Sequence, residues 1–213
     1  MSIDVETHIN QIRREVGDRV IEAGAARVVK VSRDYRDSVE DVWDAVTNPE
    51  RIPRWFLPVE GDLRLGGRYQ LQGNAGGTIE ACDPPRSFST TWEMQGAVSW
   101  LTVTLEPIET GTRFVLEHIA LAEDERAREF WDQFGPGAVG VGWDGAVLGL
   151  SLHLESGAGI DEPEAWAASE EGKRFYTLSS EAWGDAAVAW GADAEWARGA
   201  AERTTAFYTG APA

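Results

Sequence analysis

Cysteine is almost absent from this sequence, and histidine is rare. Cys82 is the only cysteine among 213 residues, so no disulfide can form within the chain, and a cytoplasmic location is the natural expectation. The three histidines, His8, His118 and His153, have neither HxxxH nor HExxH spacing, and no DxDxDG calcium loop occurs. The sequence therefore predicts no metal site and no cofactor.

Basic residues are also scarce. The chain has 19 Lys and Arg against 36 Asp and Glu, for a formal net charge of -17. Such a chain repels phosphate backbones and anionic membrane surfaces, and no stripe of Lys and Arg overrides that repulsion. The first residues, MSIDVETHINQIRREV, lack the apolar core of a signal peptide. We therefore expect neither nucleic acid nor a membrane as a partner.

The longest apolar stretch is residues 137–156, GAVGVGWDGAVLGLSLHLES. Asp144, His153 and Glu155 interrupt it, which argues against a membrane span. A second apolar row lies on another side, so the spacing predicts a long helix that is covered from several directions. The residues that recur at helical spacing on its main face are Val139, Trp143, Ala146, Val147, Leu150 and Leu154.

The chain before this helix alternates between helix and strand signals. Residues 4–23 predict an amphipathic helix, and residues 27–35 predict the first strand. Ser38 and Asn48 then have the positions of N-caps for two short helices. From residue 58 to 119, Gly- and Pro-containing turns separate six strands of an antiparallel meander.

The chain around and after the long helix is mainly helical. Residues 123–134 predict a short helix or lid segment, and Gly135-Pro136-Gly137 separates it from the long helix. Past Gly159, residues 164–168 and 170–190 predict further helices, and Asp193 can cap a last one that reaches about Phe207. Their tryptophans make us expect packing on the core or a homodimer formed through the terminal helices.

Several segments in this order resemble the START-like superfamily known as SRPBCC. The segments are VEDVWDAVTNPERIPRWF, GDLRLGGRYQL, GTIEACDPPRSFSTTWE, VTLEPIETGTRFVLEH and GWDGAVLGL. Within the superfamily they resemble homologues of the activator of the 90-kDa heat-shock-protein ATPase. The resemblance implies an α+β helix-grip fold, in which a curved antiparallel sheet wraps around a long C-terminal helix and leaves a cavity between them. It also implies a core domain at 26–158, with helical extensions at 1–25 and 159–213.

Eight aromatic residues and His118 could line such a cavity. Aromatic side chains fill cores as readily as they line pockets, but the resemblance favours a pocket. His118 shares a strand face with Phe114 and Leu116, where it could be a hydrogen-bonded core residue, a ligand contact or a general base. The predicted binding residues are Trp43, Trp55, Phe56, Tyr69, Trp92, Trp100, Phe114, His118, Trp143 and Val147.

Gly140, Gly142 and Gly145 spell GxGxxG. A dinucleotide site needs this motif directly after a strand, whereas here it lies within the predicted long helix. We therefore expect these glycines to let the helix approach the sheet, or to leave room for a ligand.

Superfamily members bind lipids, sterols, polyketides or other apolar molecules, and some cyclise or hydrolyse them. Others stimulate a chaperone ATPase. We expect this chain to bind an apolar or aromatic small molecule. The alternatives are a cyclase- or hydrolase-type enzyme that uses His118, and an interaction protein of the chaperone-activator kind. No Ser-His-Asp order with a GxSxG elbow occurs, so catalysis is the weaker expectation.

Overall fold

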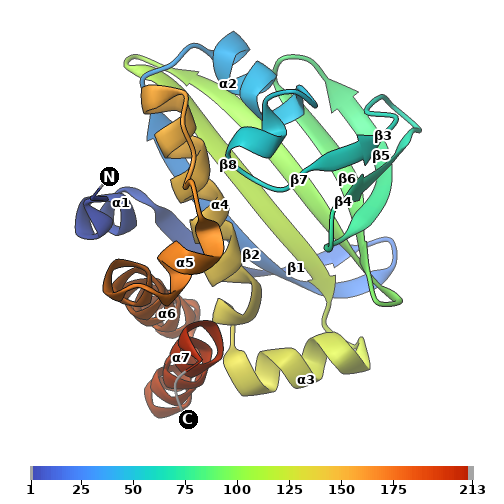
Figure 1. Cartoon of the computed structure of the whole chain (residues 1–213). Coiled ribbons are helices and arrows are strands. Elements are labelled where there is room, and N and C mark those ends of the chain that lie inside the picture. Colours follow the sequence, from blue (N-terminus) through green and yellow to red (C-terminus); the bar gives the residue numbers. More distant parts are fainter. Residues whose placement is uncertain (1, 211–213) are drawn as a thin grey trace. The chain divides into compact units, whose positions relative to one another are not determined.

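Eight strands form one antiparallel sheet in the computed structural model, which describes residues 2–210 (Figure 1). The strand order is β1-β2-β8-β7-β6-β5-β4-β3. The strands are β1 (Arg13–Ile21), β2 (Gly24–Tyr35), β3 (Val59–Gly61), β4 (Arg68–Leu71), β5 (Gly76–Asp83), β6 (Ser87–Met94), β7 (Ala97–Ile108) and β8 (Gly111–Leu121). The helices are α1 (Val5–Gln11), α2 (Val39–Thr47), the 3-10 helix η1 (Ile52–Arg54), α3 (Glu125–Phe134), α4 (Gly137–Ser156), α5 (Pro163–Ala168), α6 (Glu170–Trp190) and α7 (Ala194–Thr209).

The chain forms two compact units. Unit 1 contains the residues up to Val31, Leu121–Gly145 and the chain from Ile160 onward, and unit 2 contains Ser32–Ala120 and Ala146–Gly159. The elements β2, β8 and α4 therefore each have residues in both units. The predicted domain boundaries at residues 25 and 158 stay a prediction, and unit 2 ends at Gly159, one residue beyond the second of them.

Unit 2 contains the predicted meander of six strands. Each strand from β3 to β8 pairs antiparallel with the next one along the chain. The predicted cap is confirmed, because the Ser38 side chain accepts a hydrogen bond from the Asp41 backbone N–H at the start of α2. The second predicted helix is shorter than expected. It is the single 3-10 turn η1, and Asn48 instead accepts a hydrogen bond from the Glu50 backbone N–H.

The second half of α4 packs closely against other parts of unit 2. A Cβ atom on Gly149 would lie 2.3 Å from the backbone oxygen of Trp55, so only glycine allows this approach. The hydroxyl of Tyr35, at the end of β2, donates a hydrogen bond to the Val147 carbonyl at 3.3 Å. Leu148 and Leu150 are completely buried. This half of α4 is thus the buried helix that the apolar pattern predicts.

In unit 1 the predicted helix over residues 4–23 is wrong beyond Gln11. Asp4 caps the short helix α1, and the chain then turns into strand β1. The valines of this segment fit a helical face, but Gly17 disfavours helix, and Val16, Val20 and Ile21 are β-branched. The N-terminal segment therefore contributes a strand to the sheet as well as a helix.

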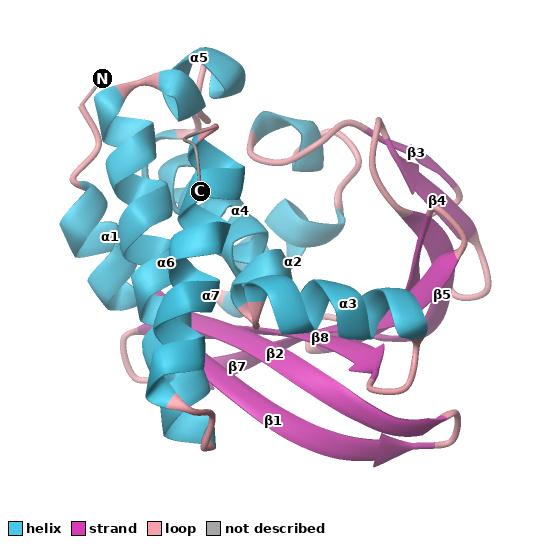
Figure 2. Cartoon of the chain, turned by 90° about the horizontal axis from the view of Figure 1, so that it is seen from below, coloured by secondary structure: helices cyan, strands magenta, loops and turns pink. Residues whose placement is uncertain are grey.

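The C-terminal helices of unit 1 follow the sequence closely. Helices α6 and α7 lie side by side (Figure 2), and a Cβ on Gly184 would lie 3.2 Å from the Ala201 methyl. The predicted Asp193 cap is confirmed, and Gly191 ends α6 with φ of 114°. The last three residues, part of the predicted C-terminal extension, lie outside the described chain. Within residues 2–210, no helix has the length and apolar character needed to cross a bilayer.

Candidate functional site

The register of β6, β7 and β8 assembles one mixed polar and aromatic face in unit 2. Opposite residues of antiparallel strands project to the same side of a sheet. Trp92 pairs with Ser99, and Leu101 pairs with both Thr90 and His118. We call this the Trp92 face, and its members are Phe88, Thr90, Trp92, Ser99, Leu101, Val103, Leu105, Phe114, Leu116 and His118.

The Trp92 face is on the side of the sheet toward α4. Phe114 meets the ring of Tyr35 edge-on, with the ring centroids 6.3 Å apart. Tyr35 in turn donates its hydroxyl hydrogen to Val147 of α4. Tyr35 therefore lies between Phe114 and Val147, which are both predicted binding residues. Tyr35 itself was not predicted from the sequence.

The polar centre of the face is a hydrogen bond between His118 and Ser99. His118 Nε2 and Ser99 Oγ are 2.8 Å apart, and the rings of His118 and Trp92 meet edge-on with centroids 6.1 Å apart. Burial lowers the pKa of His118 to about 4. The imidazole is therefore neutral near pH 7, where it can exchange hydrogen bonds with an uncharged group but is a weak base.

A second polar group lies further along the same side of the sheet. The hydroxyl of Tyr69 on β4 donates to the Thr91 carbonyl at 2.8 Å and lies 3.4 Å from Thr90 Oγ1. Burial raises the pKa of Tyr69, so its phenol is also uncharged. His118 and Tyr69 are thus both uncharged, whereas the buried Arg33 guanidinium lies 5.6 Å from the centre of the Tyr35 ring, beside Phe114.

Exposure changes along the Trp92 face. Leu101 and Phe114 retain only 7% and 3% of their accessible surface, whereas Phe88, Trp92 and Ser99 are only half-buried. A filled core leaves little of an indole accessible. The face is therefore closed around Phe114 and Leu101, and it is accessible at Trp92 and Ser99 and, separately, at Phe88, which pairs with Val103.

The helical aromatics predicted from sequence lie in unit 2 as well. Trp43 on α2 meets Phe88 edge-on at 6.0 Å, which joins it to the Trp92 face. Trp55 stacks on Phe56 at 5.5 Å and donates its indole N–H to the Ala45 carbonyl at 2.9 Å. All three predicted aromatics of this segment are half-buried.

Two predicted residues are not placed with the others. Trp100 pairs with Thr91 and Ile119, so its side chain projects from the opposite face of the sheet. We therefore remove Trp100 from the proposed site. Trp143 is buried in the part of α4 that belongs to unit 1, whereas the other predicted residues belong to unit 2. Sequence reasoning missed Ser99, although strict alternation from Leu101 places both on one face.

The GxGxxG glycines also have a different role from the predicted one. A Cβ on Gly140 would lie 2.2 Å from the indole of Trp183, which is completely buried. Gly140 therefore accommodates a side chain of α6, not the sheet. Gly145 has no atom within 4 Å of the corresponding position.

Asp144 on α4 is buried, although charged residues on helices are usually solvated. It is completely buried in unit 1, where its Oδ2 accepts hydrogen bonds from Arg14 (2.8 Å), Ser179 (2.5 Å) and Trp183 (3.2 Å). Burial raises the pKa of Asp144, and the Arg14 guanidinium opposes that shift. This cluster joins β1, α4 and α6.

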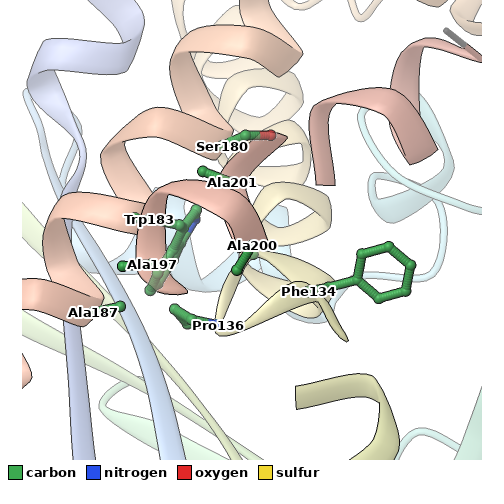
Figure 3. Close-up of a pocket in the computed structure, with 10 residues that line it drawn as sticks. Phe134, Pro136, Ser180, Trp183, Ala187, Ala197, Ala200 and Ala201 are labelled. Carbon is green, nitrogen blue, oxygen red and sulfur yellow. The ribbon is translucent and has the colours of Figure 1, made fainter. Parts of the chain in front are cut away.

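A small hollow lies between α6, α7 and the start of α4 in unit 1 (Figure 3). It has no room for a water-sized molecule, and its lining is mostly Ala and Gly, with Trp183 and Phe134. It is not the predicted cavity, because no strand contributes to its lining. Within residues 2–210, no three His, Cys, Asp or Glu side chains gather closely enough to hold a metal ion.

An antiparallel sheet with long helices packed on it, one of them α4, defines an α+β protein of the helix-grip class. Residues 37–151 match the sequence profile of the family described as activator of Hsp90 ATPase homolog 1-like protein. The chain therefore belongs to this family, within the SRPBCC superfamily. A comparison with curated proteins gave no match.

Two solved structures resemble this chain over more than residues 37–151, the part that matches the family profile. The crystal structure of CalU16 from Micromonospora echinospora has 34% identity, covers 84% of this chain and 97% of its own, and has a TM-score of 0.65. Its solution structure has 32% identity, covers 94% of both chains and has a TM-score of 0.63. MLL2253 from Mesorhizobium loti has 24% identity, covers 61% of this chain and 97% of its own, and at a TM-score of 0.53 shares the fold alone. The terminal segments are thus shared with CalU16.

Proposed function

We propose that this protein binds an uncharged apolar or aromatic small molecule on the Trp92 face, between the sheet and the second half of α4. The observation that carries the proposal is a half-buried indole, Trp92, in ring contact with a buried neutral His118 that is hydrogen-bonded to Ser99. Binding sites for small molecules combine apolar lining with a few placed polar groups. Membership of a superfamily that typically binds ligands in a cavity supports the same function.

The ligand's chemistry follows from the charges around the site. Phe88, which pairs with Val103 on the same face, and Trp43, which meets Phe88 edge-on, add half-buried apolar surface. The polar groups on or beside the face, His118, Ser99, Thr90 and Tyr69, are neutral near pH 7. An ionised ligand would lose its hydration without a compensating charge at these groups. We therefore propose a neutral ligand with an aromatic or apolar body and a single polar substituent.

Catalysis is not part of the proposal. A pKa of about 4 makes His118 a poor general base near neutrality. The adjacent Glu117 pairs with Thr102 and projects from the opposite face of the sheet, so it does not orient the imidazole. The Ser99–His118 hydrogen bond is better suited to orient a bound ligand.

The proposal is tested with Nile red, an uncharged aromatic dye whose fluorescence increases in apolar surroundings. Trp92→Ala should weaken its binding by about five- to thirtyfold, which corresponds to the loss of about 1 to 2 kcal/mol of apolar contact. Trp100→Ala is the matched control, because it removes an indole from the other face, and it should change the dissociation constant by less than about twofold.

Two results would refute the proposed site. One is an absence of Nile red binding at protein concentrations of tens of micromolar. The other is an equal loss of binding in both tryptophan variants. Native mass spectrometry of freshly purified protein complements the titration, because a retained small mass would identify the ligand class directly.

A further inference from the structure

His153 lies in the last turns of α4, within unit 2, and is almost completely buried, with 4% of its surface exposed. Its Nε2 accepts a hydrogen bond from Arg51 Nε at 3.2 Å. An arginine can only donate, so this nitrogen carries no proton and the imidazole is neutral. The backbone of Gly157, just after the end of α4, also interacts with this imidazole.

Arg51 is the centre of a small network. Its Nη1 atom binds Asp41 Oδ1 at 2.7 Å and Asp44 Oδ2 at 2.9 Å, both on α2. Arg51 itself directly precedes η1. One guanidinium therefore joins α2, the start of η1 and the end of α4.

The same two regions also touch through glycines. Gly149 lies against the backbone of Trp55, and a Cβ on Gly159 would lie 2.1 Å from the backbone oxygen of Arg54. We call residues 39–56 the α2–η1 segment. It carries Trp43, which meets Phe88 of the Trp92 face edge-on at 6.0 Å, and Trp55 and Phe56, which stack on each other.

We propose that the Arg51–His153 hydrogen bond is a latch that holds the α2–η1 segment against the end of α4, and that proton uptake by His153 releases the segment to admit ligand. This regulation rests on the proposed binding function, because the segment carries part of the proposed site. The hydrogen bond can be lost without breaking the Arg51 pairs to α2, so the segment can move as one piece.

The charges around His153 explain why a proton would release the latch. An imidazolium would present an N–H to the Arg51 donor and would face the positive charges of Arg51 and Arg54. Asp41 is the acidic group on α2 that favours the charged form, but it is already paired with Arg51, as is Asp44. Burial, Arg51 and Arg54 lower the pKa of His153 by more than the backbone of Gly157 and the carboxylate of Asp41 raise it.

The sign of the pH dependence follows from that direction. A histidine whose pKa is lower in the closed state stabilises closure fully above its ordinary pKa of about 6.5. The stabilisation is lost as the pH falls below that value. Hydrogen bonds from Arg51 and Asn48 lower the pKa of the Asp44 carboxyl, so this carboxylate remains charged at pH 5.

The test is hydrogen–deuterium exchange of the full-length protein at pH 7.5 and pH 5.0, corrected for the intrinsic pH dependence of exchange. Peptides covering residues 39–56 should exchange at least about threefold faster at pH 5.0 in the wild type. In His153→Gln, whose amide oxygen can accept from Arg51 but does not titrate, the rise should vanish. His8→Gln, a substitution of a buried histidine in unit 1, should retain the wild-type rise.

A second variant keeps the test informative if His153→Gln is poorly folded. Arg51→Gln removes the donor, so residues 39–56 should exchange rapidly at both pH values. The latch is refuted if the wild type shows no rise, if His153→Gln shows the wild-type rise, or if Arg51→Gln exchanges as slowly as the wild type at pH 7.5.

Stopped-flow mixing with Nile red separates the latch from the binding function. The association rate should rise at pH 5.0 in the wild type and not in His153→Gln. If the dye does not bind at all, the proposed function fails, while the exchange experiment still decides the latch. If the dye binds at the same rate at both pH values, the latch fails and the binding site stands.

Discussion

At the scale of single residues, burial decides what a histidine does in this protein. His118 and His153 are both buried in unit 2, and both have lowered pKa values. Their partners differ, however. His118 faces the hydroxyl of Ser99, whereas His153 faces the guanidinium of Arg51. A proton on His118 is therefore opposed by desolvation, and one on His153 is opposed by like charge as well.

His118 should make a measurable contribution to acid sensitivity. Its pKa falls from an ordinary 6.5 to about 4 on folding, so the stability it contributes is complete above about pH 6.5 and is lost as the pH falls toward 4. Between pH 7 and 4.5, the free energy of unfolding of the wild type should fall by about 2 to 3 kcal/mol more than that of His118→Gln. Urea unfolding at the two pH values measures the difference, and parallel decreases in both proteins would show that His118 does not titrate on unfolding.

At the scale of elements, α4 was predicted best and β1 worst. The apolar pattern placed a helix at 137–156, and α4 has these bounds because its apolar residues are buried in both units. The segment Arg13–Ile21 became a strand although its valines fit a helical face. Pairing in the sheet, and not helical periodicity, decided the structure of this segment. Helical periodicity over so few residues is weak evidence for a helix.

Two glycines of α4 have opposite surroundings, which makes a matched pair of substitutions. Gly140→Ala would drive a methyl group into the buried Trp183 ring and should cost about 1 to 3 kcal/mol. Gly145→Ala meets no atom within 4 Å and should gain about 0.5 to 1 kcal/mol from helix propensity. Thermal unfolding compares the two variants, and shifts in the same direction would contradict this account of Gly140.

At the scale of the whole molecule, unit 1 is assembled from three separate parts of the sequence. Arg14, Asp144 and Ser179 come from those three parts and meet at one buried carboxylate oxygen. The other oxygen, Oδ1, and Arg14 Nη2 have no hydrogen-bond partner among the described residues. The N- and C-terminal segments are therefore built into this unit through a charged contact.

Removing one member of this ion pair should be costly. Asp144→Ala leaves the Arg14 charge buried without its counter-ion, and we expect it to lower the free energy of unfolding by about 3 to 5 kcal/mol. The double variant Arg14→Met with Asp144→Leu removes both charges and should recover most of that loss. Chemical denaturation of the three proteins measures both effects. A loss below about 1 kcal/mol in Asp144→Ala would mean that the pair is solvated.

The candidate site was predictable only in part. Alternation along single strands placed Phe114 and His118 together, because side-chain direction depends on position within a strand. Trp100 was assigned wrongly because alternation was not applied along β7, where Leu101, Val103 and Leu105 occupy the other face. Alternation from Leu101 could have placed Ser99 on the face, but its hydrogen bond to His118 depends on the pairing of β7 with β8.

The sequence by itself determined the α+β class, the meander, the caps at Ser38 and Asp193 and the long apolar helix. These features depend on local periodicity, turn residues and hydrogen bonds between near neighbours in the chain. Tertiary structure alone decided that Asp144 is buried with Arg14 and that His153 is held by Arg51. Each of these depends on residues that are distant in the chain, whose proximity local pattern cannot encode.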